Sequence, residues 1–329
     1  MIRLINILAG FISHMTAENS AKKILVTGSN GLLGQKLVYA LRRRKDVSLV
    51  ATSRGQNRLK EVTGYIYESL DITDTAQVQD IVSKHQPDCI INTAAMTNVD
   101  ACETKRDECR LINVTGVENL VASVKETSAH LIQLSTDFVF DGNNGPYSEN
   151  DVPNPLSYYA QSKYDSEKVV SQSAIPWTIV RTIIIYGVSE NMSRLNLILW
   201  ALKSLRNREK IRVVTDQYRA PTLAEDLAEA CINAALKNKT GIYHVAGSET
   251  ISIIDIVNTV ADYFGLDRKL VEPVSTSALN QPARRPPRTG FIIDKAIRDL
   301  DYHPHTLKQG LEIIKNQLRE TGWLSDSKH

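Results

Sequence analysis

The chain has 329 residues and a mass of 36.7 kDa, and 42% of its residues are hydrophobic and 23% charged. At roughly 150 residues per domain, this length predicts two domains or one domain with a large elaboration, and the composition excludes a disordered chain or a fibrous repeat. Lys and Arg number 39 against 37 Asp and Glu, a net charge of +2, which argues against bulk nucleic acid or an anionic membrane as a partner because both need a concentrated basic surface.

Residues 1–21 are predicted to be an amino-terminal extension. Their apolar stretch, 4–12, is shorter than the roughly 20 residues of a membrane span and is not followed by the small-residue cleavage site of a secretion signal. We expect translation to begin at Met15, which would leave residues 1–14 untranslated. The four cysteines form no CxxC pair, so we expect a reduced, cytoplasmic compartment and no metal site.

Short β-branched runs alternate with segments of helical periodicity between residue 22 and about residue 135. The predicted strands are 23–27, 48–52, 65–69, 89–93 and 131–135, and the helices between them include 31–43 and 75–84. Strands that alternate with helices pair in parallel and are covered on both faces. The predicted fold class is therefore α/β, a doubly wound parallel-sheet Rossmann fold.

The pattern becomes less regular toward the carboxyl terminus. Further predicted elements are a helix from 159 to about 173, a strand at 177–182, irregular structure at 281–289 and a surface helix at 306–318. We therefore predict a Rossmann domain over 22–182 and a smaller substrate-binding lobe over 183–329, with segments at about 216–245 returning to the Rossmann core.

Glycines follow the first predicted strand at three positions and open the next helix. In a dinucleotide-binding turn, the first glycine makes the turn, the second lets the backbone approach a pyrophosphate, and the third lets helix and strand pack closely. The residues of this turn that are predicted to bind a dinucleotide are Gly28, Asn30, Gly31, Leu32, Leu33 and Gly34.

The second predicted strand ends in Ser53 and Arg54, where an NAD-binding protein usually has an acid for the ribose 2′-hydroxyl. A guanidinium binds a 2′-phosphate that a carboxylate would repel. NADPH is therefore the expected cofactor and NADH the second choice, and a solvated surface arginine is the alternative interpretation of Arg54. Residues after later strands are predicted to line the same cofactor: Asp71 and Ile72 at the adenine, and Ala94 and Ala95 along its wall.

Tyr159 and Lys163 lie one helical turn apart in a predicted helix, so they share a face. A phenol, with its usual pKa of about 10, is a poor acid-base catalyst at neutral pH, and a neighbouring ammonium favours its phenolate. Thr136 ends the fifth predicted strand, which faces the same crevice. Its hydroxyl is predicted to polarise a substrate carbonyl.

Together these motifs resemble the extended short-chain dehydrogenase/reductases, and within them the dTDP-4-dehydrorhamnose reductase-like family with its RmlD-type substrate-binding region. The resemblance covers about 22–318. Other matching motifs are Asn113-Val114, Arg181-Thr182 before Tyr186-Gly187, Asp216-Gln217 before Pro221-Thr222, Asp226-Leu227-Ala228 and Arg285-Pro286.

The resemblance implies that Thr136, Tyr159 and Lys163 are a catalytic triad, that Asn113 supports the proton path, and that Tyr159 and Lys163 also contact the cofactor. The implied reaction is NADPH-dependent reduction of a 4-keto group on a nucleotide-linked deoxysugar. The first candidate is the conversion of dTDP-4-dehydrorhamnose to dTDP-rhamnose.

The residues predicted to bind this substrate are Thr97, Asp137, Phe138, Val139, Arg285 and Arg288. Phe138 stands where the related dehydratases carry a glutamate, so dehydration is disfavoured. Arg285 and Arg288, together with Arg284, are predicted to bind the diphosphate, with a solvated basic loop as the alternative. Isoleucines at 183–185 replace an aromatic residue of the rhamnose reductases, so the sequence does not identify which sugar is bound.

Two other functions stay open. One is a cofactor-binding regulatory subunit that resembles methionine adenosyltransferase subunit beta, and the other is a different nucleotide-sugar reductase or epimerase. Retention of the triad favours an enzyme. We expect a monomer or homodimer that binds neither nucleic acid nor a membrane, and we expect Cys102 and Cys109 to be ordinary residues.

Overall fold

The computed structural model describes residues 21–125, 127–191 and 194–323. The predicted upstream extension, residues 1–14, and the predicted start at Met15 lie outside the described residues. Within the described part of the chain, no helix is long and apolar enough to cross a membrane.

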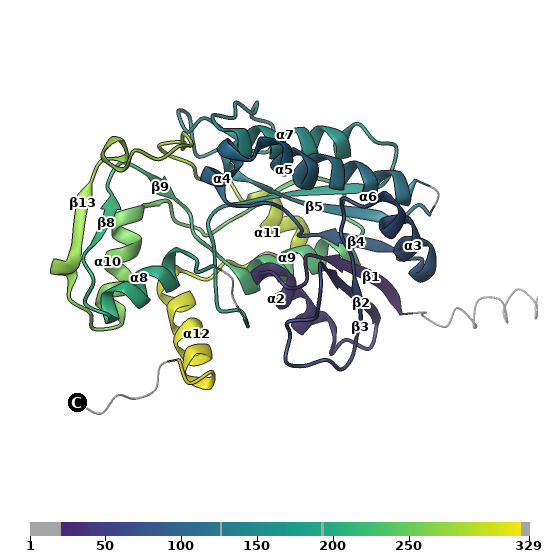
Figure 1. The fold of residues 1–329 in the computed structure, drawn as a ribbon, viewed down its shortest axis with the longest axis horizontal. Coiled ribbons are helices and arrows are strands. Elements are labelled where there is room, and N and C mark those ends of the chain that lie inside the picture. The colour runs from purple at the N-terminus through teal and green to yellow at the C-terminus, as the bar shows by residue number, and fades with distance from the viewer. Residues whose placement is uncertain (1–20, 126, 192–193, 324–329) are drawn as a thin grey trace, which may run out of the picture.

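A seven-stranded parallel sheet forms the centre of the molecule (Figure 1). Its strand order is β11-β6-β5-β4-β1-β2-β3, and every neighbouring pair is parallel. The strands are β1 (Lys22–Thr27), β2 (Val47–Ser53), β3 (Ile66–Ser69), β4 (Cys89–Asn92), β5 (His130–Thr136), β6 (Trp177–Thr182) and β11 (Gly241–Val245). The order reverses beside β1, which places a crevice at the carboxyl ends of β1 and β4. The predicted Rossmann fold is confirmed.

Helices cover both faces of this sheet, and each layer has its own hydrophobic core. One face is packed by α2 (Leu32–Leu41), α9 (Ala224–Leu236) and α11 (Asp294–Leu300). The other face is packed by α3 (Thr75–His85), α6 (Gly116–Val124) and α7 (Tyr158–Ser171). Short helices α4 (Val99–Thr104) and α5 (Arg106–Arg110) and a π-helical turn at Leu111–Thr115 precede α6.

A separate hydrophobic core holds most of the later residues together. Its elements are α8 (Leu197–Arg206), α10 (Ile253–Tyr263), α12 (Leu307–Glu320) and the parallel pair β8 (Ile211–Val214) and β13 (Val271–Val274). β11 leaves this region to pair with β6, and α9 packs on α2. A capping box at Thr306 begins α12, the helix predicted at 306–318.

Two further small sheets connect the sheet domain and this lobe. One pairs β7 (Ile185–Tyr186) with β10 (Thr222–Leu223), and the other pairs β9 (Tyr218–Arg219) with β12 (Ile251–Ser252). The segment 286–289, which we name the strap, lies along β9: Tyr218 N donates to Pro287 O at 2.8 Å, and Thr289 N donates to Tyr218 O at 3.1 Å. The irregular segment predicted at 281–289 therefore bridges to the end of β5, because the Thr289 hydroxyl bonds to Asp137.

Candidate active site

The glycine turn lies between β1 and α2 and has no room for a side chain at Gly28 or Gly34. Gly28 has a φ of +67°, and a Cβ on it would lie 2.7 Å from Ala94 N. A Cβ on Gly34 would lie 2.3 Å from the carbonyl oxygen of Gly28. In the described residues no side chain caps Gly31 at the start of α2, so backbone N–H groups are available to a phosphate. The turn thus fits the pyrophosphate of a dinucleotide.

A pocket opens beside this turn, at the carboxyl ends of β1, β2 and β4. Its lining includes nine of the residues predicted to bind the cofactor: Gly28, Asn30, Gly31, Ser53, Arg54, Asp71, Ile72, Ala94 and Ala95. The other residues predicted to contact the cofactor do not line it: Leu32, Leu33, Gly34, Tyr159 and Lys163. Leu33 is buried in the core. Four further residues line the pocket and were not predicted from the sequence: Arg58, Leu70, Thr93 and Ile112.

Two arginines line the pocket at the β2 loop. The side chain of Arg54 is 66% exposed, and its Nη1 lies 3.9 Å from Asp71 Oδ2, too far for a strong ion pair. Arg58 is placed by Asn30, whose Oδ1 accepts a hydrogen bond from the Arg58 backbone N–H at 2.9 Å. The sequence does contain a signal for Arg58. It is the second arginine in the loop after β2, the strand that has no acid at its end.

Tyr159 and Lys163 lie one turn apart near the start of α7. Tyr159 is 9% exposed and packs edge-on against Phe138, with ring centroids 6.1 Å apart. Lys163 is 3% exposed, and its Nζ donates a hydrogen bond to Leu134 O at 2.7 Å. Burial raises the pKa of Tyr159 and lowers the pKa of Lys163 to about 8. At neutral pH the site therefore holds a neutral phenol and an ammonium.

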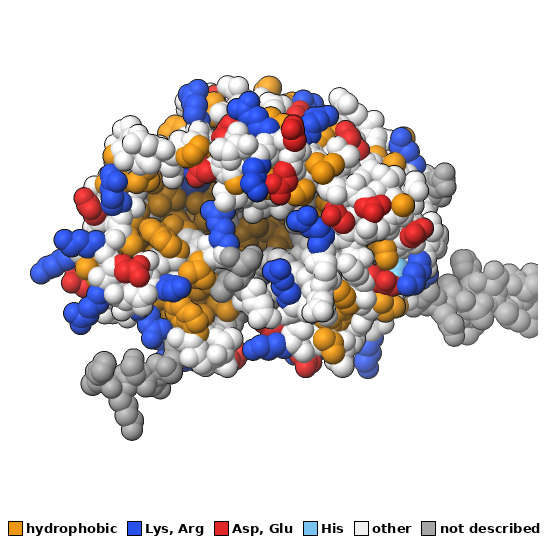
Figure 2. Space-filling model, viewed as in Figure 1, with side chains coloured by type: hydrophobic (Ala, Val, Ile, Leu, Met, Phe, Trp, Pro, Cys, Tyr) orange, Lys and Arg blue, Asp and Glu red, His pale blue; other side chains and the backbone are white. Residues whose placement is uncertain are grey.

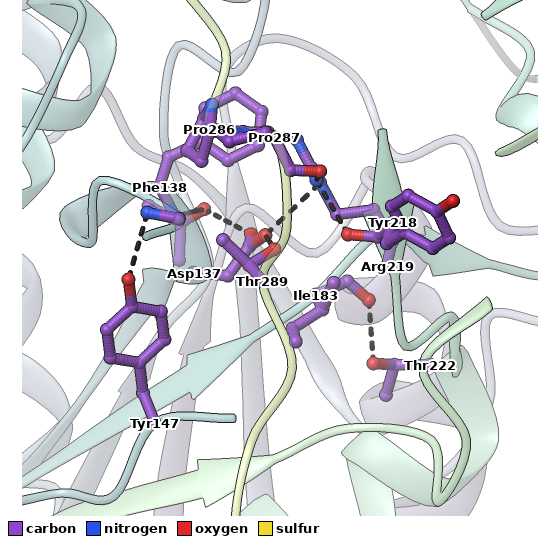
Figure 3. Close-up of polar contacts among 12 residues, drawn as sticks. Asp137, Phe138, Tyr147, Ile183, Tyr218, Arg219, Thr222, Pro286, Pro287 and Thr289 are labelled. Atoms are coloured by element: carbon purple, nitrogen blue, oxygen red, sulfur yellow. Dashed lines mark hydrogen bonds and ion pairs between the residues drawn. The ribbon is translucent and has the colours of Figure 1, made fainter. Parts of the chain in front are cut away.

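Thr136 ends β5, and its hydroxyl opposes the rise in the pKa of Tyr159 that burial causes. Its hydroxyl donates to Asp137 Oδ1 at 3.1 Å and accepts from Phe138 N at 3.2 Å. The hydrogen that we expected to polarise a substrate carbonyl is thus bonded to Asp137. Figure 3 shows Asp137 in turn beside Arg219, whose Nε lies 3.5 Å from Asp137 Oδ2.

Asn113 lies in the π-helical turn Leu111–Thr115, an irregularity that is frequent at functional sites. Its Oδ1 accepts from Met96 N at 2.8 Å, and its Nδ2 donates to Met96 O at 3.1 Å and to Ser162 Oγ at 3.0 Å. The side chain thus ties the loop after β4 to α7 in the turn between Tyr159 and Lys163. Its part in a proton path remains a prediction.

Cys102 and Cys109 lie closer to the site than the sequence suggested. Both are fully buried and pack with Tyr159 in one small cluster. The neighbouring Cys102 thiol lowers the pKa of Cys109, and Cys109 Sγ lies 3.4 Å from Ser162 Oγ. Sequence reasoning had no signal for this placement, because it depends on how α4 and α5 pack against α7.

The residues predicted to bind substrate do not all face open space. Thr97 is exposed after β4, and Phe138 is half-buried beside Tyr159. Val139 is fully buried in the main core, and Asp137 is buried among its hydrogen-bond partners. Of these four residues, Thr97 and Phe138 are therefore the two with accessible side chains.

The predicted diphosphate arginines have different surroundings. Arg285 makes a two-pronged ion pair with Asp100 of α4, at 3.0 and 2.8 Å. Arg288 is exposed and lies over the ring of Tyr218, 5.0 Å from its centroid. Figure 2 shows a hollow in the face turned to the viewer, with hydrophobic side chains on its floor and basic side chains at its rim. The guanidinium of Arg285 is thus occupied by Asp100, whereas that of Arg288 is exposed and accessible to a ligand.

Comparisons with known proteins match almost the whole described chain. The family model of the RmlD substrate binding domain matches residues 22–320. The chain is 29% identical to a dTDP-4-dehydrorhamnose reductase of Aggregatibacter actinomycetemcomitans, over 89% of this chain and 98% of that protein. It is 27% identical to methionine adenosyltransferase 2 subunit beta of Mus musculus, over 86% of this chain and 92% of that protein.

A solved structure of a reductase is also similar to this chain. The dTDP-4-dehydrorhamnose reductase of Bacillus anthracis, in complex with NADP, superposes with a TM-score of 0.77 at 29% identity. The superposition covers 90% of this chain and 99% of that chain.

Proposed function

The chain belongs to the RmlD substrate binding domain family and is an NADP-dependent oxidoreductase; on that premise we propose that it reduces the 4-keto group of a nucleotide-linked deoxysugar. NADPH is the proposed cofactor and dTDP-4-dehydrorhamnose the first substrate to test. A cytoplasmic location and a monomeric or homodimeric state remain predictions.

The pocket beside the glycine turn supports the choice of cofactor. A Cβ on Gly28 or Gly34 would collide with neighbouring backbone atoms, so these glycines keep the turn tight, and Arg54 and Arg58 supply positive charge beside Ser53 where an NAD-binding protein usually has an acid. These residues would hold the pyrophosphate and the 2′-phosphate. When bound, NADPH supplies the hydride for the keto carbon.

The proposed acid is Tyr159. Burial keeps its phenol protonated at neutral pH, so its O–H bond can break as the oxygen of the reduced carbonyl takes up the proton. The ammonium of Lys163 lies on the same face of α7 and stabilises the phenolate that remains. Phe138 packs edge-on against Tyr159 and brings no second proton-transferring group, which favours reduction over dehydration.

The observation that carries the proposal is that Thr136, Tyr159 and Lys163 meet at the end of β5, in the sheet whose strand ends form the dinucleotide pocket. The test is the loss of NADPH absorbance with dTDP-4-dehydrorhamnose and with a panel of other 4-keto nucleotide sugars. Tyr159→Phe is expected to abolish turnover and to leave NADPH affinity nearly unchanged. Substantial turnover by that variant would remove Tyr159 as the acid.

Similarity to methionine adenosyltransferase 2 subunit beta supports a second candidate function, a cofactor-binding regulatory subunit. The same assay separates the two. NADPH binding without turnover on any sugar, together with a stable complex with a methionine adenosyltransferase catalytic subunit, would favour the regulator.

A further inference from the structure

The loop between β2 and β3 carries both arginines of the cofactor pocket and has little packing to give it a shape. Arg54 and Arg58 line the pocket, and their side chains are exposed, as is that of Lys60. Within residues 54–61, only Leu59 belongs to a hydrophobic core. Because packing holds this loop at a single point, its conformation depends on the partners of its backbone hydrogen-bonding groups.

Asn30 of the glycine turn supplies two of these partners. Its Nδ2 donates a hydrogen bond to Gln56 O, and its Oδ1 accepts one from Arg58 N, both at 2.9 Å. One side chain thus binds the backbone of the loop on either side of residue 57. The bonds join the part of the pocket that fits a pyrophosphate to the part that carries the arginines.

A second set of bonds reaches the loop from the segment between β7 and α8, far away in the sequence. Glu190 Oε2 accepts a hydrogen bond from Lys60 N at 2.6 Å, and Asn191 Nδ2 donates one to Arg58 O at 3.0 Å. A bond from a backbone N–H to a carboxylate is charge-assisted and about twice as strong as a neutral one. Neither Glu190 nor Asn191 lines the described pocket, and the proposed reduction assigns them no role.

Gln35 of α2 holds Glu190 in place. Its side chain is buried, with 1% of the residue exposed, and its amide pairs with the backbone of Glu190: Nε2 donates to Glu190 O at 2.9 Å, and Oε1 accepts from Glu190 N at 2.8 Å. The same Nε2 donates to Asn30 O at 3.1 Å. Glu190 and Asn30, which both bind the arginine loop, are therefore fixed relative to each other by one buried amide.

We propose that Glu190 is a positioning residue for NADPH: by binding Lys60 N, it holds the loop in the conformation that presents the Arg58 guanidinium to the 2′-phosphate. The inference rests on the proposed function and deepens it, because it names a residue outside the pocket that decides between NADPH and NADH. A carboxylate near a phosphate repels it. The hydrogen bond and the charge of Glu190 therefore act on NADPH affinity in opposite directions, and an experiment can separate them.

The test compares Glu190→Ala, which removes the charge and the hydrogen bond, with Glu190→Gln, which removes the charge and keeps an acceptor oxygen. Isothermal titration calorimetry on the full-length protein gives the Kd of NADPH and of NADH, which differ only in the 2′-phosphate. Glu190→Ala should raise the Kd of NADPH about fivefold and leave the Kd of NADH within about twofold. Glu190→Gln should bind NADPH as tightly as the wild type or more tightly.

A matched control separates positioning from a general loss of stability. Asp88→Ala removes a similar bond, from Lys23 N to Asp88 Oδ2 at 2.8 Å, at the amino-terminal end of β1 and so at the sheet edge opposite the pocket. It should leave the ratio of the two Kd values unchanged, whatever its melting temperature. Should Glu190→Ala not fold, Asn191→Gly decides: residue 191 has a φ of +48°, which glycine adopts readily, and this variant should also raise the Kd of NADPH alone.

An unchanged or lower Kd of NADPH in Glu190→Ala would overturn the inference, because the charge of Glu190 would then be its main effect. Equal losses of NADPH affinity in the Ala and Gln variants, or equal losses for NADPH and NADH, would also overturn it. A wild-type protein that binds NADPH and NADH equally tightly contradicts the proposed cofactor instead, and the inference falls with it.

Discussion

The ammonium of Lys163 donates a 2.7 Å hydrogen bond to the carbonyl oxygen of Leu134. This bond joins α7 to β5 two residues before Thr136, so the helix that carries Tyr159 is fixed to the strand end that faces it. Lys163 is 3% exposed, and burial lowers its pKa to about 8. The positive charge that we propose stabilises the Tyr159 phenolate is therefore lost when the pH rises through about 8.

The pH profile of the reduction should show this loss. We expect kcat/KM to be level below the pKa of Lys163, about 8, and to fall above it, since only the protonated amine stabilises the phenolate. Lys163→Met should have a lower rate throughout and should lack this alkaline fall. An alkaline fall of the same midpoint in Lys163→Met would assign it to another group.

Arg54 and Arg58 should decide between NADPH and NADH. Each guanidinium can give a charge-assisted hydrogen bond to the 2′-phosphate, a contact worth about 1.5–3 kcal/mol. Arg54→Ala and Arg58→Ala are each expected to raise KM for NADPH about tenfold or more and to leave KM for NADH unchanged. Arg44→Ala, which removes an exposed arginine paired with Asp46, is the control. Equal losses with both cofactors would contradict a phosphate contact.

Arg288 should matter more than Arg285 for binding the nucleotide sugar. The guanidinium of Arg285 is occupied by Asp100 and by Ala283 O, whereas that of Arg288 is exposed over Tyr218. Arg288→Ala should raise KM for the sugar about fivefold to tenfold and leave KM for NADPH unchanged. Arg285→Ala should mainly lower stability, by about 1 kcal/mol, because the pair is partly solvated. A larger KM effect in Arg285→Ala would reverse the assignment.

The sequence predicted the parts of the site that depend on local patterns. Gly28 and Gly34 are required by contacts within a single β-turn-α unit, and Tyr159 and Lys163 share a face of one helix. Hydrophobic periodicity was also sufficient for the five predicted strands of the Rossmann core.

Local patterns could not predict the contacts of residues that tertiary packing brings together. Asp100 binds Arg285 only because α4 packs beside the segment before the strap. Arg219 meets Asp137 because β9 and the strap cross the end of β5. Val139, predicted to touch substrate, is in the core because the short turn after β5 directs it there. Periodicity within one element contains no information about such crossings.

Asn113 gives a final test of how the site is held. Its side chain makes two hydrogen bonds with the backbone of Met96 and one with Ser162. Asn113→Ala leaves the Met96 N–H without this partner, so we expect a loss of about 1–3 kcal/mol in the free energy of unfolding.

Asn113→Ala should also lower kcat more than it raises KM for NADPH. The reason is that α7 loses its hydrogen bond to the loop after β4 at Ser162, which lies in the turn between Tyr159 and Lys163. The matched control is Asn233→Ala in α9, which removes a hydrogen bond to Leu300 O of α11 and should lower stability with kcat intact. Urea unfolding and steady-state kinetics on both variants make the comparison. If both variants lose stability and kcat in the same proportion, Asn113 has no positioning role beyond that of any buried amide.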